Sequence, residues 1–444
     1  MTIELIPVGG FTEVGKNMTA VRVGEEIIII DMGFFLPALV NFEEEGGDRR
    51  TLNREGLINI HAIPDDTILH PFKEHVKAIV LSHCHLDHIG ATPWLAPHYP
   101  QAPIIGTPYT MQVLNNAIQE DKTNLKNPRI PVNPNGKITI SKTITIELIQ
   151  VTHSTIHTAV VAIHTPEGTV LYANDYKFDS TPVVGATANT KRLRELGTEN
   201  VRCLVSNSLY SNSEGKTPSE KVAREMLKEV LLGTENHTSA VFATTFASHI
   251  ARLTSLYDFG QKLDRKVVFL GRSMLKYVKA AEQLGMIKYP HAEIIGYADK
   301  IQKKLKEIQK HPSKYLVVCT GGQGEPQSVL SKITNGVLPF SFQKEDHIIF
   351  SNNVIPVPIN LQNRGDLEQK LKQRGVRIFN KIHVSGHGSK EDIRDMIKLT
   401  KPQLLVPTHG YPQMYTGVKE LAGEMGYELG KTIRIAKNSV KMTI

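Results

Sequence analysis

A short run of histidine and aspartate residues is the clearest chemical feature of the sequence. The run Ser-His-Cys-His-Leu-Asp-His ends at His88 and directly follows the apolar segment VKAIVL. In an extended segment, residues i and i+2 project to the same side, so His83 and His85 can converge on one metal ion. Asp87 and His88 then point toward a second ion. Imidazole and carboxylate ligands suit Zn²⁺, and Mn²⁺ is an alternative where oxygen ligands are added.

Three more candidate ligands stand further along the chain, each at the end of a predicted strand. His153 follows the segment ITIELIQVT, Asp175 follows VLYAN, and His409 follows LLVPT. Each is weak evidence alone, because histidine and aspartate at strand ends are often turn formers. Together they supply a second group of ligands for each ion. Two ions about 3.5–4 Å apart can activate water and polarise a phosphoryl or acyl centre, which permits phosphodiesterase, thioesterase or lactonase chemistry.

Several segments combine histidine, hydroxyl and glycine residues in patterns suited to binding phosphate. HVSGHG offers two histidines, a serine and backbone N–H groups freed by glycine. TGGQGEP and FASH also indicate anion sites, through glycine N–H groups and a helix start with hydroxyl donors. Each has a plain alternative as a turn or a helix start. The candidate phosphate-binding residues are Ser248, His249, Arg272, Gly321, Gly322, Gln323, His383, Ser385 and His387.

The elements that must position these residues change character along the chain. Short β-branched runs such as 4–8, 19–23 and 26–30 predict a strand-rich first part with helices interspersed. The segment Thr217-Pro-Ser-Glu220 then predicts a helix start with Thr217 as the N-cap. From there strand-like and helical runs alternate, which is typical of a parallel α/β unit.

Composition and charge exclude some classes of protein. The 444 residues are 40% hydrophobic and 22% charged, as in globular proteins rather than disordered ones. Lys and Arg number 52 against 44 Asp and Glu, and this charge of +8 fits a nucleic-acid partner without establishing one. No apolar run approaches the ~20 residues that span a bilayer. With no secretory leader and only three cysteines, we expect a cytoplasmic protein without a membrane partner.

The order of the motifs resembles the metallo-β-lactamase fold, and within it the ribonuclease J family of β-CASP nucleases, in its compact archaeal type. The resemblance covers nearly the whole chain. It implies an α/β fold in which a metallo-β-lactamase αββα sandwich is interrupted by an inserted β-CASP α/β domain. The expected domains are a first metallo-β-lactamase part at 1–212, the β-CASP domain at 213–355 and a returning metallo-β-lactamase part at 356–444. Asp31 in IIIIDMG matches the family's first motif, a structural aspartate that orients the H-x-H-x-D-H loop.

The same resemblance implies roles for the candidate ligands. One ion takes His83, His85, His153 and Asp175, and the other takes Asp87, His88, Asp175 and His409. Asp87, Asp175 and His387 become the catalytic residues, with His387 beside the leaving group as general acid. The chain departs from the family at Ser-Asn207-Ser, where relatives usually carry an acidic residue. One carboxylate is then missing, and we expect proton handling or stabilisation of the leaving group to differ.

The function implied is a ribonuclease that degrades single-stranded RNA from 5′ to 3′ by two-metal hydrolysis, favouring 5′-monophosphate ends. Its cofactors would be two divalent ions, Zn²⁺ or alternatively Mn²⁺, and we expect a homodimer. The alternatives are an endoribonuclease of the same fold, a non-catalytic RNA-binding β-CASP subunit and a small-molecule metallo-hydrolase. A non-catalytic subunit should have lost ligands, and all seven are present. A small-molecule hydrolase would need neither the inserted segment nor HVSGHG.

Overall fold

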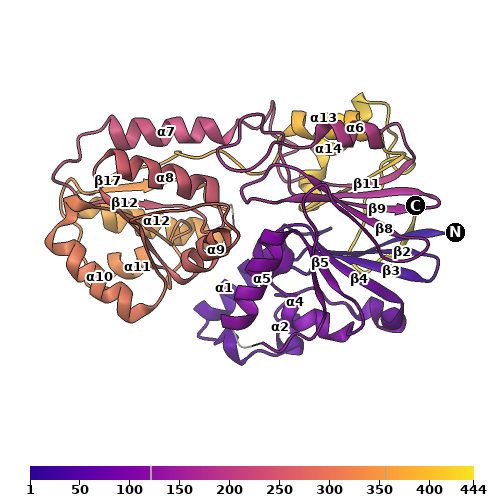
Figure 1. The fold of residues 1–444 in the computed structure, drawn as a ribbon, viewed down its shortest axis with the longest axis horizontal. Helices are drawn as coiled ribbons and strands as arrows, with labels where there is room; N and C mark the ends of the chain where they lie inside the picture. The colour runs from indigo at the N-terminus through magenta and orange to yellow at the C-terminus, as the bar shows by residue number, and fades with distance from the viewer. Residues whose placement is uncertain (121–122, 356) are drawn as a thin grey trace. The chain divides into compact units, whose positions relative to one another are not determined.

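Three sheets organise the chain in the computed structural model, which describes residues 1–120, 123–355 and 357–444 (Figure 1). They are distributed over two compact units. Unit 1 comprises Met1–Asp179, Ala186–Thr217 and Gly386–Ile444, and unit 2 comprises Ser180–Gly185 and Pro218–Ser385. The chain therefore leaves unit 1, builds unit 2 and returns, which is the interrupted architecture expected from the sequence.

The first sheet of unit 1 has the strand order β19-β1-β2-β3-β4-β5-β6. Its strands are β1 (Ile3–Gly9), β2 (Met18–Val23), β3 (Glu26–Ile30), β4 (Val76–Leu81), β5 (Ile104–Gly106), β6 (Arg129–Pro131) and β19 (Met442–Thr443). The first three strands pair antiparallel, and β3 to β6 pair parallel. β3 and β4 are almost continuous runs of Ile, Val, Leu and Ala because both faces of the sheet are covered here.

The second sheet of unit 1 has the order β18-β11-β10-β9-β8-β7. Its strands are β7 (Lys137–Thr139), β8 (Thr145–Gln150), β9 (Ala159–Thr165), β10 (Gly168–Ala173), β11 (Val201–Asn207) and β18 (Leu404–Thr408). One hydrophobic core contains side chains from both sheets, such as Ile28 and Val80 from the first and Val161 and Val205 from the second. The two sheets thus pack face to face as the central layers of a sandwich.

Helices cover the outer faces of this sandwich. On the second sheet, α6 (Thr190–Leu196), α13 (Lys390–Thr400) and α14 (Tyr415–Glu424) bury Leu193, Ile397 and Leu421 against Leu171 and Leu405 of the strands. On the side of the first sheet lie α1 (Leu36–Glu44), α2 (Arg54–Asn59), α3 (Leu86–Ile89), α4 (Thr92–Leu95) and α5 (Pro108–Glu120), of which α5 packs beside β5 and β6 (Figure 1). The αββα arrangement is the predicted one.

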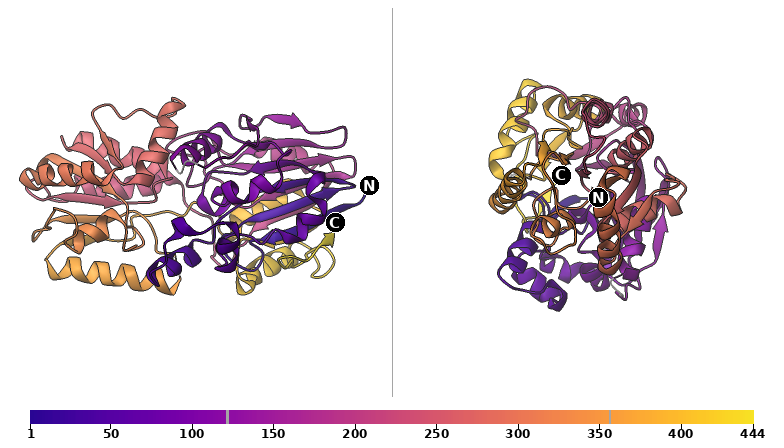
Figure 2. Two further views of the ribbon diagram at one scale, coloured as in Figure 1. Left: turned by 90° about the horizontal axis from the view of Figure 1, so that it is seen from below. Right: turned by 90° about the vertical axis from the view of Figure 1, so that its left-hand side faces the viewer.

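Unit 2 contains one parallel sheet of order β14-β13-β15-β12-β16-β17. The strands are β12 (Val241–Thr244), β13 (Lys266–Leu270), β14 (Glu293–Ile295), β15 (Tyr315–Cys319), β16 (His347–Phe350) and β17 (Arg377–Phe379). Helices lie on both faces of the sheet (Figure 2). They are α7 (Glu220–Leu232), α8 (Ile250–Lys262), α9 (Arg272–Gln283), α10 (Ala298–Lys310), α11 (Val329–Thr334) and α12 (Pro358–Gln373).

Two sequence predictions about unit 2 need correction. The return to the metallo-β-lactamase part was expected at 356, a residue that itself lies outside the described ranges. The next two elements stay with unit 2 instead, because β17 pairs with β16 and α12 buries Leu367 and Leu371 in the core of this unit. In addition, α7 is capped by Ser219 rather than Thr217. The hydroxyl of Thr217 donates to the backbone oxygen of His387 at 2.8 Å and so is already engaged.

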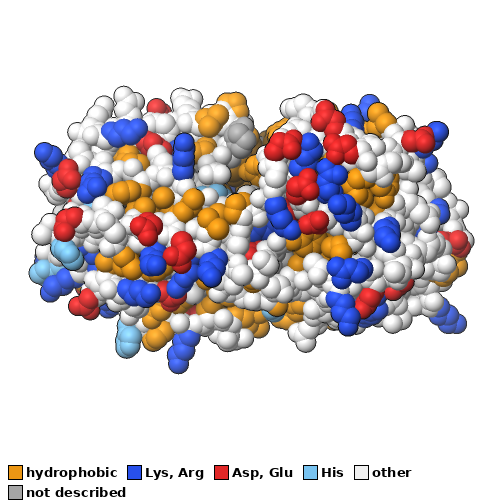
Figure 3. All heavy atoms as spheres, turned by 90° about the horizontal axis from the view of Figure 1, so that it is seen from above, with side chains coloured by type: hydrophobic (Ala, Val, Ile, Leu, Met, Phe, Trp, Pro, Cys, Tyr) orange, Lys and Arg blue, Asp and Glu red, His pale blue; other side chains and the backbone are white. Residues whose placement is uncertain are grey.

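Charges are dispersed over the surface. On the face drawn in Figure 3, Lys and Arg side chains alternate with Asp and Glu rather than forming one basic field. The net charge of +8 therefore does not by itself mark a binding surface on this face. Among the helices of the described ranges, none is both long enough and apolar enough to cross a bilayer.

Candidate active site

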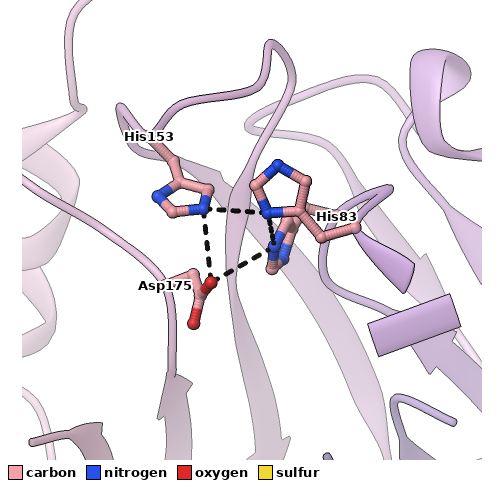
Figure 4. Close-up of side chains that lie close together, drawn as sticks. His83, His153 and Asp175 are labelled. Atoms are coloured by element: carbon pink, nitrogen blue, oxygen red, sulfur yellow. Dashed lines mark hydrogen bonds and ion pairs between the residues drawn. The ribbon is translucent and has the colours of Figure 1, made fainter. Parts of the chain in front are cut away.

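The seven predicted metal ligands converge at strand ends within unit 1. His83 and His85 follow β4, and α3, which carries Asp87 and His88, begins directly after them. His153 lies beyond the end of β8, Asp175 beyond β10 and His409 beyond β18. Both sheets therefore contribute to one cluster, as the strand-end positions in the sequence predicted. Figure 4 shows His83, His153 and Asp175 pointing toward one another.

The first candidate ligand group is His83, His85, His153 and Asp175. Nδ1 of His85 lies 3.1 Å from Nε2 of His83 and 3.1 Å from Nε2 of His153. Oδ2 of Asp175 lies 3.4 Å from Nε2 of His83 and 3.2 Å from Nε2 of His153. Four atoms that surround Zn²⁺ tetrahedrally at about 2.0–2.1 Å are about 3.3–3.4 Å apart. The spacing of these donors therefore fits a divalent ion.

The second candidate ligand group is Asp87, His88 and His409. Oδ2 of Asp87 lies 3.4 Å from Nε2 of His88 and 3.9 Å from Nε2 of His409. Nε2 of His88 also lies 3.5 Å from Oδ2 of Asp175. The same oxygen of Asp175 thus faces both groups, which is the arrangement a carboxylate needs to be shared between two ions.

The protonation states of most of these groups also fit cation binding; the exception is His88, where burial alone would lower the pKa but the carboxylates of Asp87, Asp175 and Asp31 raise it above its ordinary value. Burial lowers the pKa of the imidazoles of His83, His85, His153 and His409, which favours the neutral form that ligates metals. Burial alone would raise the pKa of Asp87 and Asp175, but the neighbouring histidines outweigh it and hold both below the ordinary range. Among the described residues, neither carboxylate forms an ion pair with a Lys or Arg. Oδ1 of Asp175 is buried without a hydrogen-bond partner, so a cation would complete its environment.

Asp31 contacts the second group through His88. It is fully buried, and its Oδ1 accepts from the backbone N–H of Ser82 at 2.8 Å. Its Oδ2 accepts from the Ser82 hydroxyl at 2.9 Å and lies 2.7 Å from Nδ1 of His88. A carboxylate on Nδ1 of a histidine orients the ring and leaves Nε2 free to bind metal. This geometry agrees with the orienting role that the resemblance implied for Asp31.

The main chain at Asp31, Gly33 and His409 has unusual geometry that allows the segment with Asp87 and His88 to lie close to the other candidate ligands. Asp31 and His409 both adopt positive φ angles, 61° and 53° respectively, which is unusual for residues other than glycine. Gly33 faces the backbone of Asp87 so closely that a Cβ would lie 1.6 Å from its carbonyl oxygen. Any other residue at Gly33 would therefore displace the helix that carries Asp87 and His88.

Sequence reasoning missed Asn17, which contacts the second ligand group. Its side chain is 1% exposed, and its Nδ2 donates to the backbone oxygen of Asp87 at 3.0 Å. Its Oδ1 lies 3.0 Å from Nδ1 of His409. The only local signal was a polar residue directly before an apolar strand, which is too common to single out a residue.

His387 is the predicted general acid, and Asn207 occupies the position where an acidic residue was expected. Nε2 of His387 lies 3.8 Å from Oδ2 of Asp175, and with Asp175 and His409 it could form a further ligand group. The geometry alone therefore permits His387 to bind an ion as well as to carry a proton. Asn207 ends β11 and is fully buried; its Oδ1 accepts from the N–H of Leu209 at 3.0 Å, and its Nδ2 is without a partner.

The other predicted phosphate-binding residues lie in unit 2, at the carboxyl edge of its parallel sheet. Ser248 and His249 follow β12, Arg272 begins α9 after β13, and the 321–323 loop follows β15. His383 and Ser385 follow β17. The carboxyl ends of parallel strands share one edge, so the fold of unit 2 collects these segments together, as ligand sites of open α/β sheets are collected.

Buried bonds hold this edge of unit 2 in shape. Arg252 is fully buried, and its Nε and Nη2 donate to Glu220 at 2.6 and 2.9 Å. Its Nη1 donates to the backbone oxygen of Ser351 at 2.8 Å and to that of Ile382 at 3.3 Å. Arg252 therefore links the end of β16 to the segment that enters HVSGHG.

Gln323 has a structural task at this edge. Its Nε2 donates to the backbone oxygen of Asn353 at 2.9 Å, and its Oε1 accepts from the N–H of Ile355 at 2.7 Å. Both polar ends of the side chain thus hold the segment after β16. The observed role of Gln323 is to shape the edge, and direct contact of its amide with a phosphate stays a prediction.

Comparison with known families matches all three parts of the chain. Residues 11–188 match the Metallo-beta-lactamase superfamily, residues 238–364 match the family described as Ribonuclease J, beta-CASP domain, and residues 374–435 match the Zn-dependent metallo-hydrolase RNA specificity domain. The last two matches bracket residues 365–373 in α12, whereas the compact units divide after Ser385.

Individual relatives match over nearly the full length. The chain is 43% identical to Ribonuclease J of Methanocaldococcus jannaschii over 99% of its own length and 98% of the relative's, and 43% identical to Ribonuclease J of Pyrococcus abyssi over 98% and 96%. Ribonuclease J of Synechocystis sp. is 32% identical over 96% of the chain and 63% of that protein. A solved structure of a protein of unknown function from Enterococcus faecalis, 19% identical, aligns over 100% of both chains with a TM-score of 0.66, which shows likeness of fold alone.

Proposed function

The chain belongs to the ribonuclease J family of the metallo-β-lactamase superfamily and is a hydrolase of RNA, and from this premise we propose that it degrades single-stranded RNA from the 5′ end by two-metal phosphodiester hydrolysis. The observation that carries the proposal is the pair of ligand groups that face one oxygen of Asp175. Two divalent ions bound there, Zn²⁺ or Mn²⁺, would supply an activated water and neutralise charge on the phosphoryl group.

The protein's own residues prepare that chemistry. His83, His85 and His153 supply neutral nitrogens to the first group beside Asp175. Asp87 supplies a carboxylate oxygen to the second group. His153 is held in place because its Nδ1 donates to the backbone oxygen of Gly386 at 2.7 Å. His387 is proposed to deliver a proton to the departing ribose oxygen, and its position beside Asp175 supports that role.

The edge of unit 2 is proposed to hold RNA phosphates and the 5′ end. Its support is the convergence of a helix start with hydroxyl and histidine groups, an arginine at the next helix start and a glycine loop. HVSGHG carries residues of this edge and of the metal cluster within one short segment of sequence. A site that binds the 5′ end would favour stepwise removal of nucleotides from that end over internal cutting.

The mode of cleavage is tested with one RNA sequence prepared with a 5′-monophosphate, a 5′-triphosphate or a 5′-hydroxyl and labelled at either end. We expect mononucleotides from the 5′ label and progressive shortening of the 3′-labelled strand, fastest for the monophosphate. Internal fragments that are independent of the 5′ group would establish the endoribonuclease alternative instead. RNA binding without any hydrolysis by metal-loaded protein would establish the non-catalytic alternative.

A variant of one ligand separates chemistry from binding. Asp87→Ala should abolish hydrolysis and leave RNA affinity near its wild-type value, because the phosphate contacts proposed for unit 2 are unchanged. Asp366→Ala, on the exposed side of α12, is the matched control and should retain full activity. Cleavage by Asp87→Ala at the wild-type rate would remove the proposed mechanism.

The homodimer and the cytoplasmic location stay predictions. Light scattering after size-exclusion chromatography tests whether the protein is a homodimer.

A further inference from the structure

Asn17 is a buried amide whose orientation is dictated by its surroundings. Its Nδ2 lies 3.0 Å from the backbone oxygen of Asp87 and 3.3 Å from Oδ2 of the same residue. A carbonyl and a carboxylate oxygen only accept hydrogen bonds, so the nitrogen end of the amide must face Asp87. The backbone N–H of Asn17 donates to the same carbonyl at 3.1 Å and fixes the main chain there.

The oxygen end of the amide then faces two donors. Oδ1 of Asn17 lies 3.0 Å from Nδ1 of His409 and 2.9 Å from Nδ2 of Asn174. Because an amide oxygen only accepts, Nδ1 of His409 must carry the hydrogen. In a neutral imidazole the lone pair then lies on Nε2. This is the nitrogen that faces Oδ2 of Asp87.

The contact of Asn17 with His88 favours the same tautomer as in His409, with the hydrogen on Nδ1. Nδ2 of Asn17 lies 3.1 Å from Nε2 of His88, while Nδ1 of His88 faces the carboxylate of Asp31. An NH₂ group near Nε2 and an acceptor near Nδ1 both favour the tautomer with its hydrogen on Nδ1. Asn17 therefore touches all three members of the second ligand group. Within the described part of the chain, no hydrogen bond of its side chain reaches His83, His85 or His153.

We propose that Asn17 is a positioning residue for the second ligand group alone. Its hydrogen bond to the backbone oxygen of Asp87 fixes the orientation of its amide, and in that orientation the amide sets the tautomer and ring position of His409. The inference rests on the proposed two-ion centre and deepens it. It assigns a determinant of cation binding to a residue outside the histidine and aspartate motifs. Loss of such a partner weakens metal binding typically 10–100-fold.

The variant test compares Asn17→Ala with Asn41→Ala, a matched loss of an exposed asparagine in α1. Each protein is stripped with a chelator and dialysed against buffered Zn²⁺, and bound zinc is counted per chain. We expect two ions in wild type and in Asn41→Ala. In Asn17→Ala one ion should bind with unchanged affinity and the other about 10–100-fold more weakly. Two ions bound by Asn17→Ala with wild-type affinities would overturn the inference.

A second measurement uses the unmodified chain and does not depend on whether the variant folds. ¹⁵N chemical shifts of labelled histidine report the tautomer of each ring, and the resonances of His409 are identified by their loss in His409→Gln. We expect His409 with its hydrogen on Nδ1, and a hydrogen on Nε2 would overturn the inference. A wild-type chain that binds fewer than two ions would refute the proposed centre, whereas the tautomer would still decide the role of Asn17.

Discussion

Replacing Asp31 by asparagine should weaken one cation site through a change of tautomer in His88, a neighbouring residue whose own identity is unchanged. The backbone N–H of Ser82 donates to Oδ1 of Asp31, so the oxygen of the new amide must take that place. The NH₂ group then takes the place of Oδ2, which faces the Ser82 hydroxyl and Nδ1 of His88. The hydroxyl can rotate to accept. His88 can only respond by moving its hydrogen to Nε2, the nitrogen that faces Asp87.

The magnitude follows from the loss of that ligand atom. A histidine protonated on Nε2 cannot donate a lone pair there, and loss of a partner of this kind weakens metal binding about 10–100-fold. In free energy this is about 1.4–2.7 kcal/mol for the ion at the second group. Asp31 reaches the first group only through the Ser82 hydroxyl, which lies 3.0 Å from Nδ1 of His83, so the ion there should be affected less than the ion at the second group. The shape of the side chain is unchanged, which keeps the buried packing around β3 and β4 intact.

Competition with a chromophoric zinc chelator measures both affinities on stripped protein. Wild type should show two tight ions, and Asp31→Asn should show one tight ion and one weakened at least tenfold. Asp366→Asn, the same change at an exposed position of α12, should match wild type. Two unweakened ions in a folded Asp31→Asn protein would refute the tautomer reasoning.

Further predictions concern stability, thiol reactivity and the departure at Asn207. Arg252→Met should lower the free energy of unfolding by about 3–5 kcal/mol, because Glu220 is left charged and buried; a loss below about 1 kcal/mol in urea titrations would contradict this. Burial alone would raise the pKa of Glu147, but hydrogen bonds from His164 and Arg192 lower it from 4.5 to about 2. The contribution of Glu147 to stability is therefore complete above pH 4.5 and is lost as the pH falls toward 2. Glu147→Gln should reduce that acid dependence in unfolding titrations of metal-free protein, and an identical pH profile would argue against it. The three cysteines are buried and burial raises the pKa of each to about 12, so a thiol reagent at pH 8 should label none in the native protein and three after denaturation, and fast native labelling would contradict their burial. Asn207→Asp should increase the rate of RNA cleavage if the missing carboxylate limits proton transfer, and an unchanged rate would show that this position is not limiting.

The positions of the candidate ligands could be predicted because each depends on local sequence. A histidine or aspartate directly after a buried strand must appear at the end of that strand, and parallel or packed sheets bring such ends together. His83, His153 and His409 are therefore found where the sequence expected them. The interrupted architecture was also visible, since alternating strands and helices replace strand-rich sequence near residue 217.

What could not be predicted depends on contacts between distant residues. Asn17 acquires its role from Asp87 and His409, which are 70 and 392 positions away. The hydroxyl of Thr217 is captured by a carbonyl 170 positions later, so the cap moves to Ser219. β17 is a strand of three residues, too short to reveal which sheet it joins, and only its pairing with β16 assigns it to unit 2.

The two-ion centre itself is tested most directly by diffraction from zinc-loaded crystals at the zinc absorption edge. We expect two anomalous peaks about 3.5–4 Å apart, one among His83, His85 and His153 and the other among Asp87, His88 and His409, with Asp175 between them. A single peak, or zinc bound away from Asp175, would contradict it.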